Sequence, residues 1–419
     1  MRILVIGKGG REHAIIWALK KSASIAHIYC APGNAGIAEL AECVPIKESE
    51  FQQIAQFALD YAIDLVVVGP DDPLADGIVD VLEERGVPVF GPRKNAAIIE
   101  GSKVFTKDLL KKYNIPTAAY ESFEDYDAAI AYVRRQGAPI VIKADGLAAG
   151  KGVIVAQTLE EAEQALKEIM VDKVFGKSGS QVVIEEFLQG QEMSILSFVD
   201  GDVVRPMVPS QDHKQVFDGD KGPNTGGMGT YSPLPHIAQS VIDEAIETII
   251  KPTAEAMVKE GRPFRGVLFA GLMITKDGPK TIEFNARFGD PETQVVLSLL
   301  ETDLIDIFLA TINGRLKDMD IRWSDESAVC VILASGGYPG SYPKGIPIHG
   351  LDEVQESVVF HAGTALKDGQ VVTDGGRVLG VTARGATIEE ARAKAYADAE
   401  RIRFEGMQYR KDIALKALL

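Results

Sequence analysis

A stretch of alternating polar and apolar residues places the strongest limit on how this chain can fold. From Lys280 to Asn285 the side chains follow the period of a strand with one buried face. Glu283 and Asn285 are therefore expected on one side of the strand. Ile282 and Phe284 are expected to pack beneath them. Because an Asn and a following Arg-Phe-Gly-Asp-Pro-Glu turn are unusual at a strand end, the stretch favours a functional site over a solvated edge.

The outward side chains of this strand carry oxygen ligands that hard cations prefer. The Glu283 carboxylate and the Asn285 amide oxygen should lie about 7 Å apart along the strand. Magnesium keeps several waters and takes further oxygens from substrate phosphates, so two protein ligands are enough. We therefore predict a Mg²⁺ (or Mn²⁺) site on Glu283 and Asn285. Residues 266–274, the expected preceding strand, carry no acid, so the number of metal ions stays open.

Composition and charge exclude several classes of protein. With 419 residues, 46% of them hydrophobic and 25% charged, the chain fits a globular protein of roughly three domains. Its net charge of −16 opposes nonspecific nucleic-acid binding. No apolar run reaches the roughly 18 residues of a membrane span. The apolar start ends in glycines too early for a secretory signal, so we expect a cytoplasmic protein.

The first hundred residues read as an open α/β unit with a mainly parallel sheet. Strands and helices alternate there: strands are expected at 2–7, 27–30, 64–68 and 87–90, and helices at 52–60 and 77–85. Glycine-rich loops follow three of these strands, on the carboxyl edge where such sheets bind ligands. These loops are 7–13, 32–36 and 69–74.

The first of these loops raises the alternative of a nicotinamide-dependent dehydrogenase. Glu12 stands where a dinucleotide fingerprint has its third glycine. The second strand ends at Cys30, where an NAD-binding unit would place an acid for the ribose. Both features argue against NAD. The helix start can still hold a phosphate, with Arg11 adding a charged hydrogen bond, whereas His13 is expected to have a packing or capping role.

A second glycine-rich segment joins two strand-like runs between Pro139 and Ala156. It is not a Walker A loop, because only three residues separate Gly146 from Gly150 and a glycine follows Lys151. The segment instead predicts a β-hairpin with a mobile flap. A solvated turn would explain the glycines but not Lys143, which sits in an apolar strand. Upstream, Ser102 is a plausible N-cap of a helix that runs to residue 113.

Together these motifs resemble the glycinamide ribonucleotide synthetase (phosphoribosylamine-glycine ligase) family of ATP-grasp carboxylate-amine ligases. The resemblance runs in order from the first strand to Tyr409–Ile413. It implies that ATP phosphorylates glycine to glycyl phosphate, and that the amine of 5-phosphoribosylamine then displaces phosphate. The product would be glycinamide ribonucleotide, made in de novo purine synthesis. The implied partners are glycine, 5-phosphoribosylamine and ATP, and we expect a monomer.

The expected fold combines α/β and α+β domains. Residues 1–102 should form an N-terminal open parallel-sheet domain that binds substrate. Residues 103–322 should form an ATP-grasp core of two lobes, with the flap lobe at about 119–190. Residues 323–419 should form a small C-terminal α+β domain that closes one side of the cleft, and we assign no chemistry to it.

The resemblance also implies roles for individual residues. The ATP-binding set is Lys103, Lys143, Lys151, Glu185, Glu186, Phe187, Leu188 and Glu192. The substrate-binding set is Gly9, Gly10, Arg11, Glu12, Pro32, Gly33, Asn34, Asp212, His213, Lys214, Asn224, Thr225, Gly226, Arg287, Gly289, Asp290, Pro291 and Glu292. The catalytic set is Arg287, Lys143 and Asp212.

Residues 209–229 read as a long polar loop, and such loops are usually functional. Its Asn-Thr-Gly-Gly-Met-Gly end could offer backbone N–H groups to an acyl phosphate. Two alternatives stay open beside the main interpretation. One is an ATP-grasp ligase for another acid or amine. The other is a non-catalytic ATP-binding module, against which Glu283, Asn285 and Lys143 argue as a set.

Overall fold

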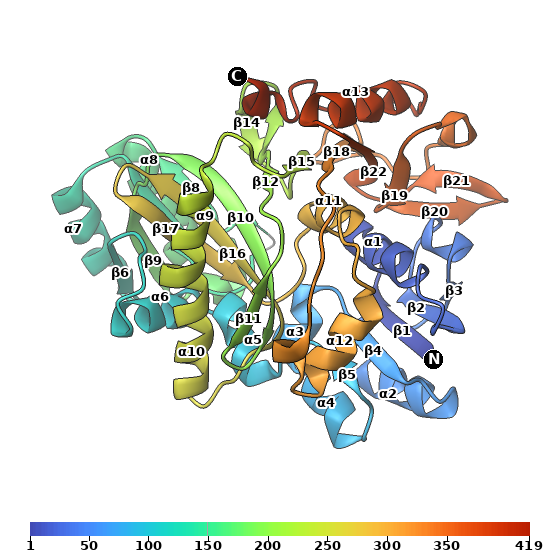
Figure 1. Cartoon of the computed structure of the whole chain (residues 1–419). Helices are drawn as coiled ribbons and strands as arrows, with labels where there is room; N and C mark the ends of the chain where they lie inside the picture. The colour runs from blue at the N-terminus through green and yellow to red at the C-terminus, as the bar shows by residue number, and fades with distance from the viewer. Residues whose placement is uncertain (149) are drawn as a thin grey trace.

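The computed structural model describes residues 1–148 and 150–419, and its N-terminal part is the predicted α/β unit (Figure 1). Five parallel strands lie in the order β3-β2-β1-β4-β5. The short apolar runs form the buried strands, and amphipathic helices cover them. The elements are β1 (Arg2–Gly7), α1 (Gly10–Leu19), β2 (His27–Pro32), β3 (Glu42–Cys43), α2 (Phe51–Asp60), β4 (Leu65–Val68), α3 (Asp71–Asp76), α4 (Ile78–Glu84), β5 (Val89–Phe90) and α5 (Lys94–Gly101).

The flap lobe is a four-stranded antiparallel sheet in the order β6-β9-β7-β8. It contains the predicted hairpin, in which β7 pairs with β8. The predicted flap includes Ala149, which lies outside the described residues. The elements are α6 (Lys103–Lys112), β6 (Tyr120–Phe123), α7 (Tyr126–Gln136), β7 (Ile140–Ala144), β8 (Val153–Ala156), α8 (Leu159–Leu166) and β9 (Val182–Glu186).

The second lobe is also antiparallel, with strand order β11-β10-β16-β17. The elements are β10 (Gln191–Asp200), β11 (Val203–Pro206), α9 (Gln239–Ala245), α10 (Lys251–Lys259), β16 (Arg265–Thr275), β17 (Gly278–Asn285), α11 (Glu292–Ser298) and α12 (Leu304–Ile312).

One prediction about β17 is wrong. Phe284 is buried as predicted, but Ile282 is only half-buried and lines the cleft. The reason is a β-bulge: Gly271 pairs with Glu283 and Leu272 with Thr281, so Ile282 has no partner across the ladder.

The C-terminal sheet has the order β12-β15-β18-β22-β19, and α13 packs on β18 and β22. Strands β12 and β15 thus share one sheet with β18, β22 and β19, whereas β13 with β14 and β20 with β21 form two separate two-stranded sheets. The elements are β12 (Gln211–Asp212), β13 (Gln215–Phe217), β14 (Lys221–Asn224), β15 (Gly229–Ser232), β18 (Ser327–Ala334), β19 (Val358–His361), β20 (Thr364–Lys367), β21 (Gln370–Thr373), β22 (Arg377–Gly385) and α13 (Ile388–Ala399).

The prediction of one long polar loop at 209–229 is also wrong, because the segment holds four short strands. The β13–β14 hairpin turns at Gly219 and Asp220, both with positive φ. The buried Arg410 anchors it through Asp220 at 3.0 Å, and Gly219 N–H donates to Asp412 at 2.9 Å. Partners about 190 residues away therefore order a segment that looks loop-like locally.

The flap lobe has a hydrophobic core that is separate from the core joining the other parts of the chain. One cluster is continuous from the N-terminal sheet through the second lobe to the C-terminal sheet, and includes Leu4, Met193 and Val331. The flap lobe has its own cluster, which includes Val133 and Ile142. The flap lobe is therefore held together by apolar contacts of its own. Among the described helices, none is long and apolar enough to cross a membrane.

Candidate active site

A cavity of about 480 Å³ lies where the two lobes and the N- and C-terminal parts meet. The structure brings many of the predicted site residues together around it. These are Arg11, Lys103, Lys143, Glu185, Glu192, Lys214, Asn224, Thr225, Gly226, Glu283, Asn285, Arg287, Asp290 and Glu292. The predicted residues outside its lining are Gly9, Gly10, Glu12, Pro32, Gly33, Asn34, Lys151, Glu186, Phe187, Leu188, Asp212, His213, Gly289 and Pro291.

At one end of the cleft, two buried lysines share one buried carboxylate. Lys143 Nζ lies 3.0 Å from one oxygen of Glu185, and Lys107 Nζ lies 3.2 Å from the other. Lys107 also donates to Thr117 at 2.7 Å. Burial lowers the pKa of Lys107 to about 8, although Glu185 opposes this. The pair of cations is thus held in place before any ligand arrives.

The start of α6 connects this end to the flap. Ser102 is the predicted N-cap, and its hydroxyl accepts from Phe105 N–H at 3.1 Å. The same hydroxyl contacts the Asp145 carboxylate at 3.2 Å. Lys103 Nζ donates to the Gly146 carbonyl at 2.8 Å. Burial lowers the pKa of Lys103, although Glu283 opposes this. Helix and flap are therefore tied at the cleft wall.

Glu283 is central to the charges of the cleft. Enclosure by protein opposes its ionisation, but Lys143, Lys214, Lys103 and Arg287 together lower the pKa of its carboxyl. Its side chain reaches the open cleft because Gly271 lies opposite on β16. A Cβ on Gly271 would come within 3.3 Å of the Glu283 side chain. The carboxylate is therefore ionised and accessible.

Glu283 and Asn285 fit a metal ion that takes most of its ligands from phosphate and water. Both line the cleft and present oxygen. In the part of the chain that the structure describes, no three His, Cys, Asp or Glu residues gather as a metal cage. An ion with few protein ligands, such as one bound together with a nucleotide, matches this set better than a protein-only site.

Arg287 is oriented by a buried acid that local sequence did not indicate. Its Nη2 lies 3.0 Å from Glu100, whose other oxygen accepts from Ala286 N–H at 2.7 Å. Burial raises the pKa of Glu100, although Arg287 opposes this. Arg287 Nε is buried without a hydrogen-bond partner. Arg287 itself lines the cleft.

A second charged group lies on the substrate side. Lys214 Nζ is 2.7 Å from Asp212 and 3.8 Å from Glu292. Asp212 stands behind Lys214, which itself lines the cleft. Burial raises the pKa of Glu292, although Lys214 opposes this, and its Oε1 is buried without a hydrogen bond. Such an orphaned oxygen can accept from a ligand amine.

Asp290 joins the N-terminal and C-terminal parts. Arg11 N–H donates to one of its oxygens at 3.1 Å, and Arg377 Nη2 lies 3.6 Å from the other. Burial favours the neutral carboxyl of Asp290, but the two arginines outweigh burial, so the pKa of Asp290 is lowered. The C-terminal part, which was predicted to close one side of the cleft, thus also contributes the cation of Arg377 to the cleft lining.

Three predicted substrate residues make hydrogen bonds within the protein. Asn34 donates to the His361 carbonyl at 2.8 Å, and its Oδ1 accepts two backbone N–H groups. Glu12 is buried and accepts from Gly9 N–H at 2.8 Å. Both ring nitrogens of His213 bond backbone groups, with Nδ1 2.9 Å from the Gly229 carbonyl. His13 accepts from His361 N–H, which agrees with its expected structural role.

The expectation that the 224–229 loop offers N–H groups to an acyl phosphate is wrong. Thr225 N–H bonds the Lys214 carbonyl, and Gly226 N–H bonds the Tyr338 hydroxyl. Gly227 N–H bonds the Thr225 hydroxyl at 3.0 Å. These donors are used inside the protein. The loop can still contact a ligand through its side chains.

The predicted ATP-binding residues at 185–188 lie in different environments. Glu185 points into the cleft, whereas Glu186 is exposed and accepts from Ala119 N–H at 3.2 Å. Phe187 and Leu188 are half-buried beyond the lining. Glu192 lines the cleft, and enclosure raises the pKa of its carboxyl.

Several lining residues were missed. Lys107 carried a usable signal, because it lies one helical turn after Lys103 and so shares its face. Glu100 and Arg377 carried no such signal, because each contacts a partner that lies far away along the chain. The lining residues not predicted include Glu100, Thr106, Lys107, Met193, Ser194 and Arg377, whereas Asp71 lies in the predicted 69–74 loop.

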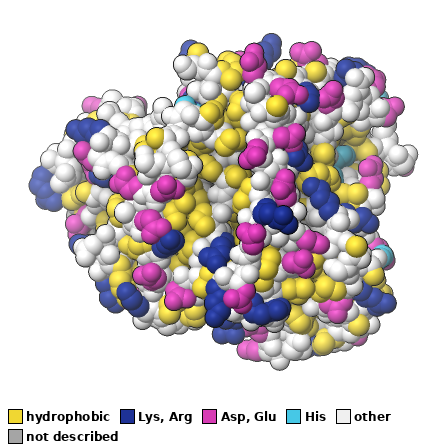
Figure 2. Space-filling view, viewed as in Figure 1, with side chains coloured by type: hydrophobic (Ala, Val, Ile, Leu, Met, Phe, Trp, Pro, Cys, Tyr) yellow, Lys and Arg dark blue, Asp and Glu magenta, His cyan; other side chains and the backbone are white. Residues whose placement is uncertain are grey.

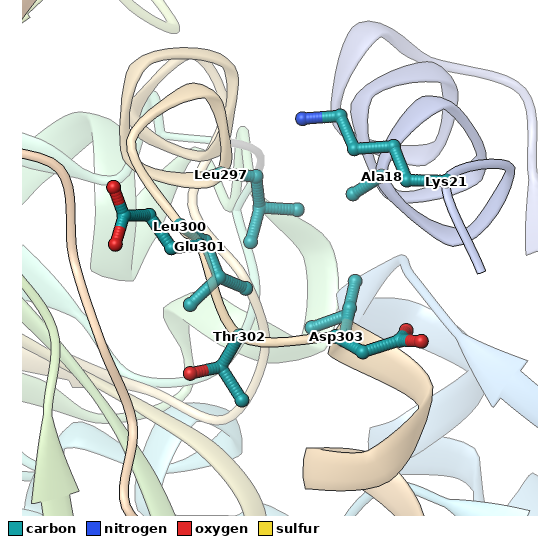
Figure 3. A pocket seen from close by; sticks show the side chains of 8 residues that line it. Ala18, Lys21, Leu297, Leu300, Glu301, Thr302 and Asp303 are labelled. Carbon is teal, nitrogen blue, oxygen red and sulfur yellow. The ribbon is translucent and has the colours of Figure 1, made fainter.

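A smaller cavity of about 120 Å³ lies apart from the cleft, between the end of α1 and the α11–α12 connection (Figure 3). In Figure 3 Lys21 faces Leu297 and residues 300–303 across it. The Lys21 ammonium already stacks on Trp17, 3.7 Å from the ring centroid. This cavity holds none of the predicted residues.

The fold and cleft define the class of protein. Two antiparallel lobes, a glycine-rich hairpin flap, strand and helix lysines and an acid–amide pair are the parts of an ATP-grasp enzyme. The biotin carboxylase of Campylobacter jejuni, solved with β,γ-ATP, has a TM-score of 0.75 at 14% identity, covering 97% of this chain and 92% of that one. At this identity the similarity concerns the fold alone.

Closer similarities identify the family. Three family profiles described as phosphoribosylglycinamide synthetase match: the N domain at residues 1–100, the ATP-grasp (A) domain at 101–293 and the C domain at 328–416. A phosphoribosylamine–glycine ligase of Caldanaerobacter subterraneus subsp. tengcongensis is 53% identical over 99% of both chains. The Thermotoga maritima enzyme of that name has a TM-score of 0.87 and 38% identity, over 99% of this chain and 100% of its own.

The chain belongs to the phosphoribosylglycinamide synthetase family. It is an ATP-grasp ligase, and its reaction is the synthesis of glycinamide ribonucleotide in purine biosynthesis. As a member of this class it uses ATP and a divalent metal ion.

Proposed function

We propose that this cleft joins glycine to 5-phosphoribosylamine through glycyl phosphate. The observation that carries the proposal is the position of Glu283, which interacts with lysines of the nucleotide end and with Lys214 and Arg287 of the substrate end. A site that transfers phosphate to a carboxylate must bring anions together. Cations around one central carboxylate provide that environment.

In the first step a glycine carboxylate oxygen attacks the γ-phosphorus, and the bond from phosphorus to the ADP oxygen breaks. Lys143 and Lys103 neutralise phosphate charge at this end. Arg287, held by Glu100 and lining the cleft, binds the glycine carboxylate or the transferred phosphate. Positioning and electrostatics supply most of the rate, because no covalent intermediate with the protein is required.

In the second step the amine of 5-phosphoribosylamine attacks the acyl carbon. The new C–N bond replaces the C–O bond to phosphate, and the departing phosphate can accept the amine proton. Glu292, which lines the cleft, orients the glycine ammonium or the attacking amine, and Asp212 holds Lys214 from behind. The flap at 146–152 closes over the site and keeps water from the acyl phosphate.

We propose Mg²⁺ (or Mn²⁺) as the ion, held by Glu283 and Asn285. When bound, the ion supplies charge neutralisation of the phosphates. Glu192 is placed to accept from the ribose hydroxyls of ATP. We propose Lys151, Glu186, Phe187 and Leu188 as nucleotide contacts in a closed flap, and Gly9, Gly10, Pro32 and Gly33 as backbone contacts of the phosphoribosyl group.

We also propose the organisation of the whole protein. The functional divisions are 1–102, 103–322 and 323–419, with the flap lobe at about 119–190. The protein acts as a monomer in the cytoplasm. On the face in Figure 2, basic and acidic side chains are interspersed, which gives no extended basic field for a nucleic acid.

The test is ADP release with glycine and 5-phosphoribosylamine omitted in turn. We expect full turnover only with both, together with a product of the mass of glycinamide ribonucleotide. Turnover with another acid or amine, but not with these, would overturn the choice of substrates. ATP binding without turnover in every mixture would favour the non-catalytic module.

A further inference from the structure

We propose that Arg377 is a positioning residue for the acyl-transfer half of the cleft, so that the C-terminal part shapes the substrate site. This rests on the proposed function. Arg377 is the first residue of β22, and its side chain lines the cleft. The loop that it holds lies about 150 residues earlier in the chain. Its contacts, and not its position alone, support the role.

The guanidinium binds two segments of the ATP-grasp part at once. Arg377 Nη1 donates to the Gly226 carbonyl at 2.9 Å and to the Asp290 carbonyl at 2.9 Å. Its Nη2 lies 3.6 Å from the Asp290 carboxylate. One side chain therefore fixes the distance between the 224–227 loop and the 287–292 turn, which carry residues of the substrate end.

A second residue of the C-terminal part holds the same loop from its donor side. Gly226 N–H donates to the Tyr338 hydroxyl at 3.0 Å. The N–H and the carbonyl of Gly226 are thus both bound by residues of the C-terminal part. The loop and Arg377 also pack closely: a Cβ on Gly226 would lie 2.9 Å from the guanidinium carbon. A side chain at position 226 would therefore push the guanidinium away from its place.

The residues of the nucleotide end do not depend on the contacts of Arg377. Lys143 and Lys107 each pair with Glu185, and Lys103 donates to the flap carbonyl of Gly146. No hydrogen bond or ion pair joins Arg377 to these four among the described residues. Loss of Arg377 should therefore move the substrate residues while leaving ATP binding intact. A role in overall folding alone would not separate the two.

The experiment compares Arg377→Met and Arg377→Lys with the wild type. For Arg377→Met we expect kcat/KM for 5-phosphoribosylamine to fall about 100-fold, because small misplacements of reacting groups have that effect. The Kd for ATP, measured by calorimetry, should stay within about twofold. Arg377→Lys can reach one carbonyl and should recover part of the loss. Tyr338→Phe should show a smaller loss in the same direction.

The matched control is Arg384→Met on the same strand, where the arginine is exposed and pairs with Glu326. It should keep wild-type kinetics. Unchanged kinetics in Arg377→Met, or equal losses of ATP binding and turnover, would overturn the inference. If the wild type itself makes no product from glycine and 5-phosphoribosylamine, the proposed function fails instead. Circular dichroism of each variant confirms that it is folded.

Discussion

At the scale of single residues, the cleft depends on a few charges whose environments differ sharply. Glu283 stays ionised because several cations face it, whereas Glu292 and Glu100 have raised pKa values because burial dominates. Acids with such different environments can take different roles in one cleft. Glu283 suits a cation, and Glu292 suits a hydrogen-bonded amine.

Replacing Glu283 by Ala should strongly reduce metal-dependent turnover without unfolding the protein. We expect kcat to fall on the order of 100-fold, the size usual for removing one charge-stabilising group. The Mg²⁺ concentration needed for half-maximal ADP release should also rise. Asp277→Ala, an exposed acid on the turn of the same hairpin, is the control. Equal activity of both variants would remove the metal assignment.

Lys107 gives a prediction about pH. Its folded pKa of about 8 lies below the ordinary 10.5, so between these values the unfolded chain binds more protons and stability rises with pH. Relative to Lys107→Met, the free energy of unfolding of the wild type should gain on the order of 3 kcal/mol across that window. Chemical denaturation at several pH values measures it. A difference that does not change with pH would contradict the burial argument.

At the scale of elements, periodicity and capping predicted most of the structure. The alternation around Glu283 gave β17, and Ser102 capped α6 as expected. The bulge at Ile282 was not predictable, because it depends on register with β16. The β13–β14 hairpin was missed because Arg410 and Asp412, far along the chain, stabilise its turn.

The cap of α6 should affect both stability and nucleotide binding. Ser102→Ala removes a cap worth about 1 kcal/mol and also the contact with Asp145 of the flap. Thr158→Ala removes the matching cap of α8, outside the cleft lining. Both variants should lose similar stability in denaturant titrations. Only Ser102→Ala should raise the KM for ATP, and a parallel rise in Thr158→Ala would show that general loosening is the cause.

At the scale of the whole molecule, the site is formed where four parts of the chain meet. The family motifs supplied the residues that each part contributes, but not the partners that join the parts. Glu100 and Arg377 show this, since each lies far in sequence from the residue it orients. Local sequence patterns therefore predicted which residues line the cleft better than they predicted the contacts that hold its parts together.

The central claim is that ATP activates the glycine carboxylate in this cleft, and oxygen transfer tests it most directly. Glycine labelled with ¹⁸O in its carboxylate is supplied with ATP and 5-phosphoribosylamine, and the released phosphate is analysed by mass spectrometry. Attack of the carboxylate on the γ-phosphorus predicts one labelled oxygen in each phosphate. Turnover that releases unlabelled phosphate would contradict the account.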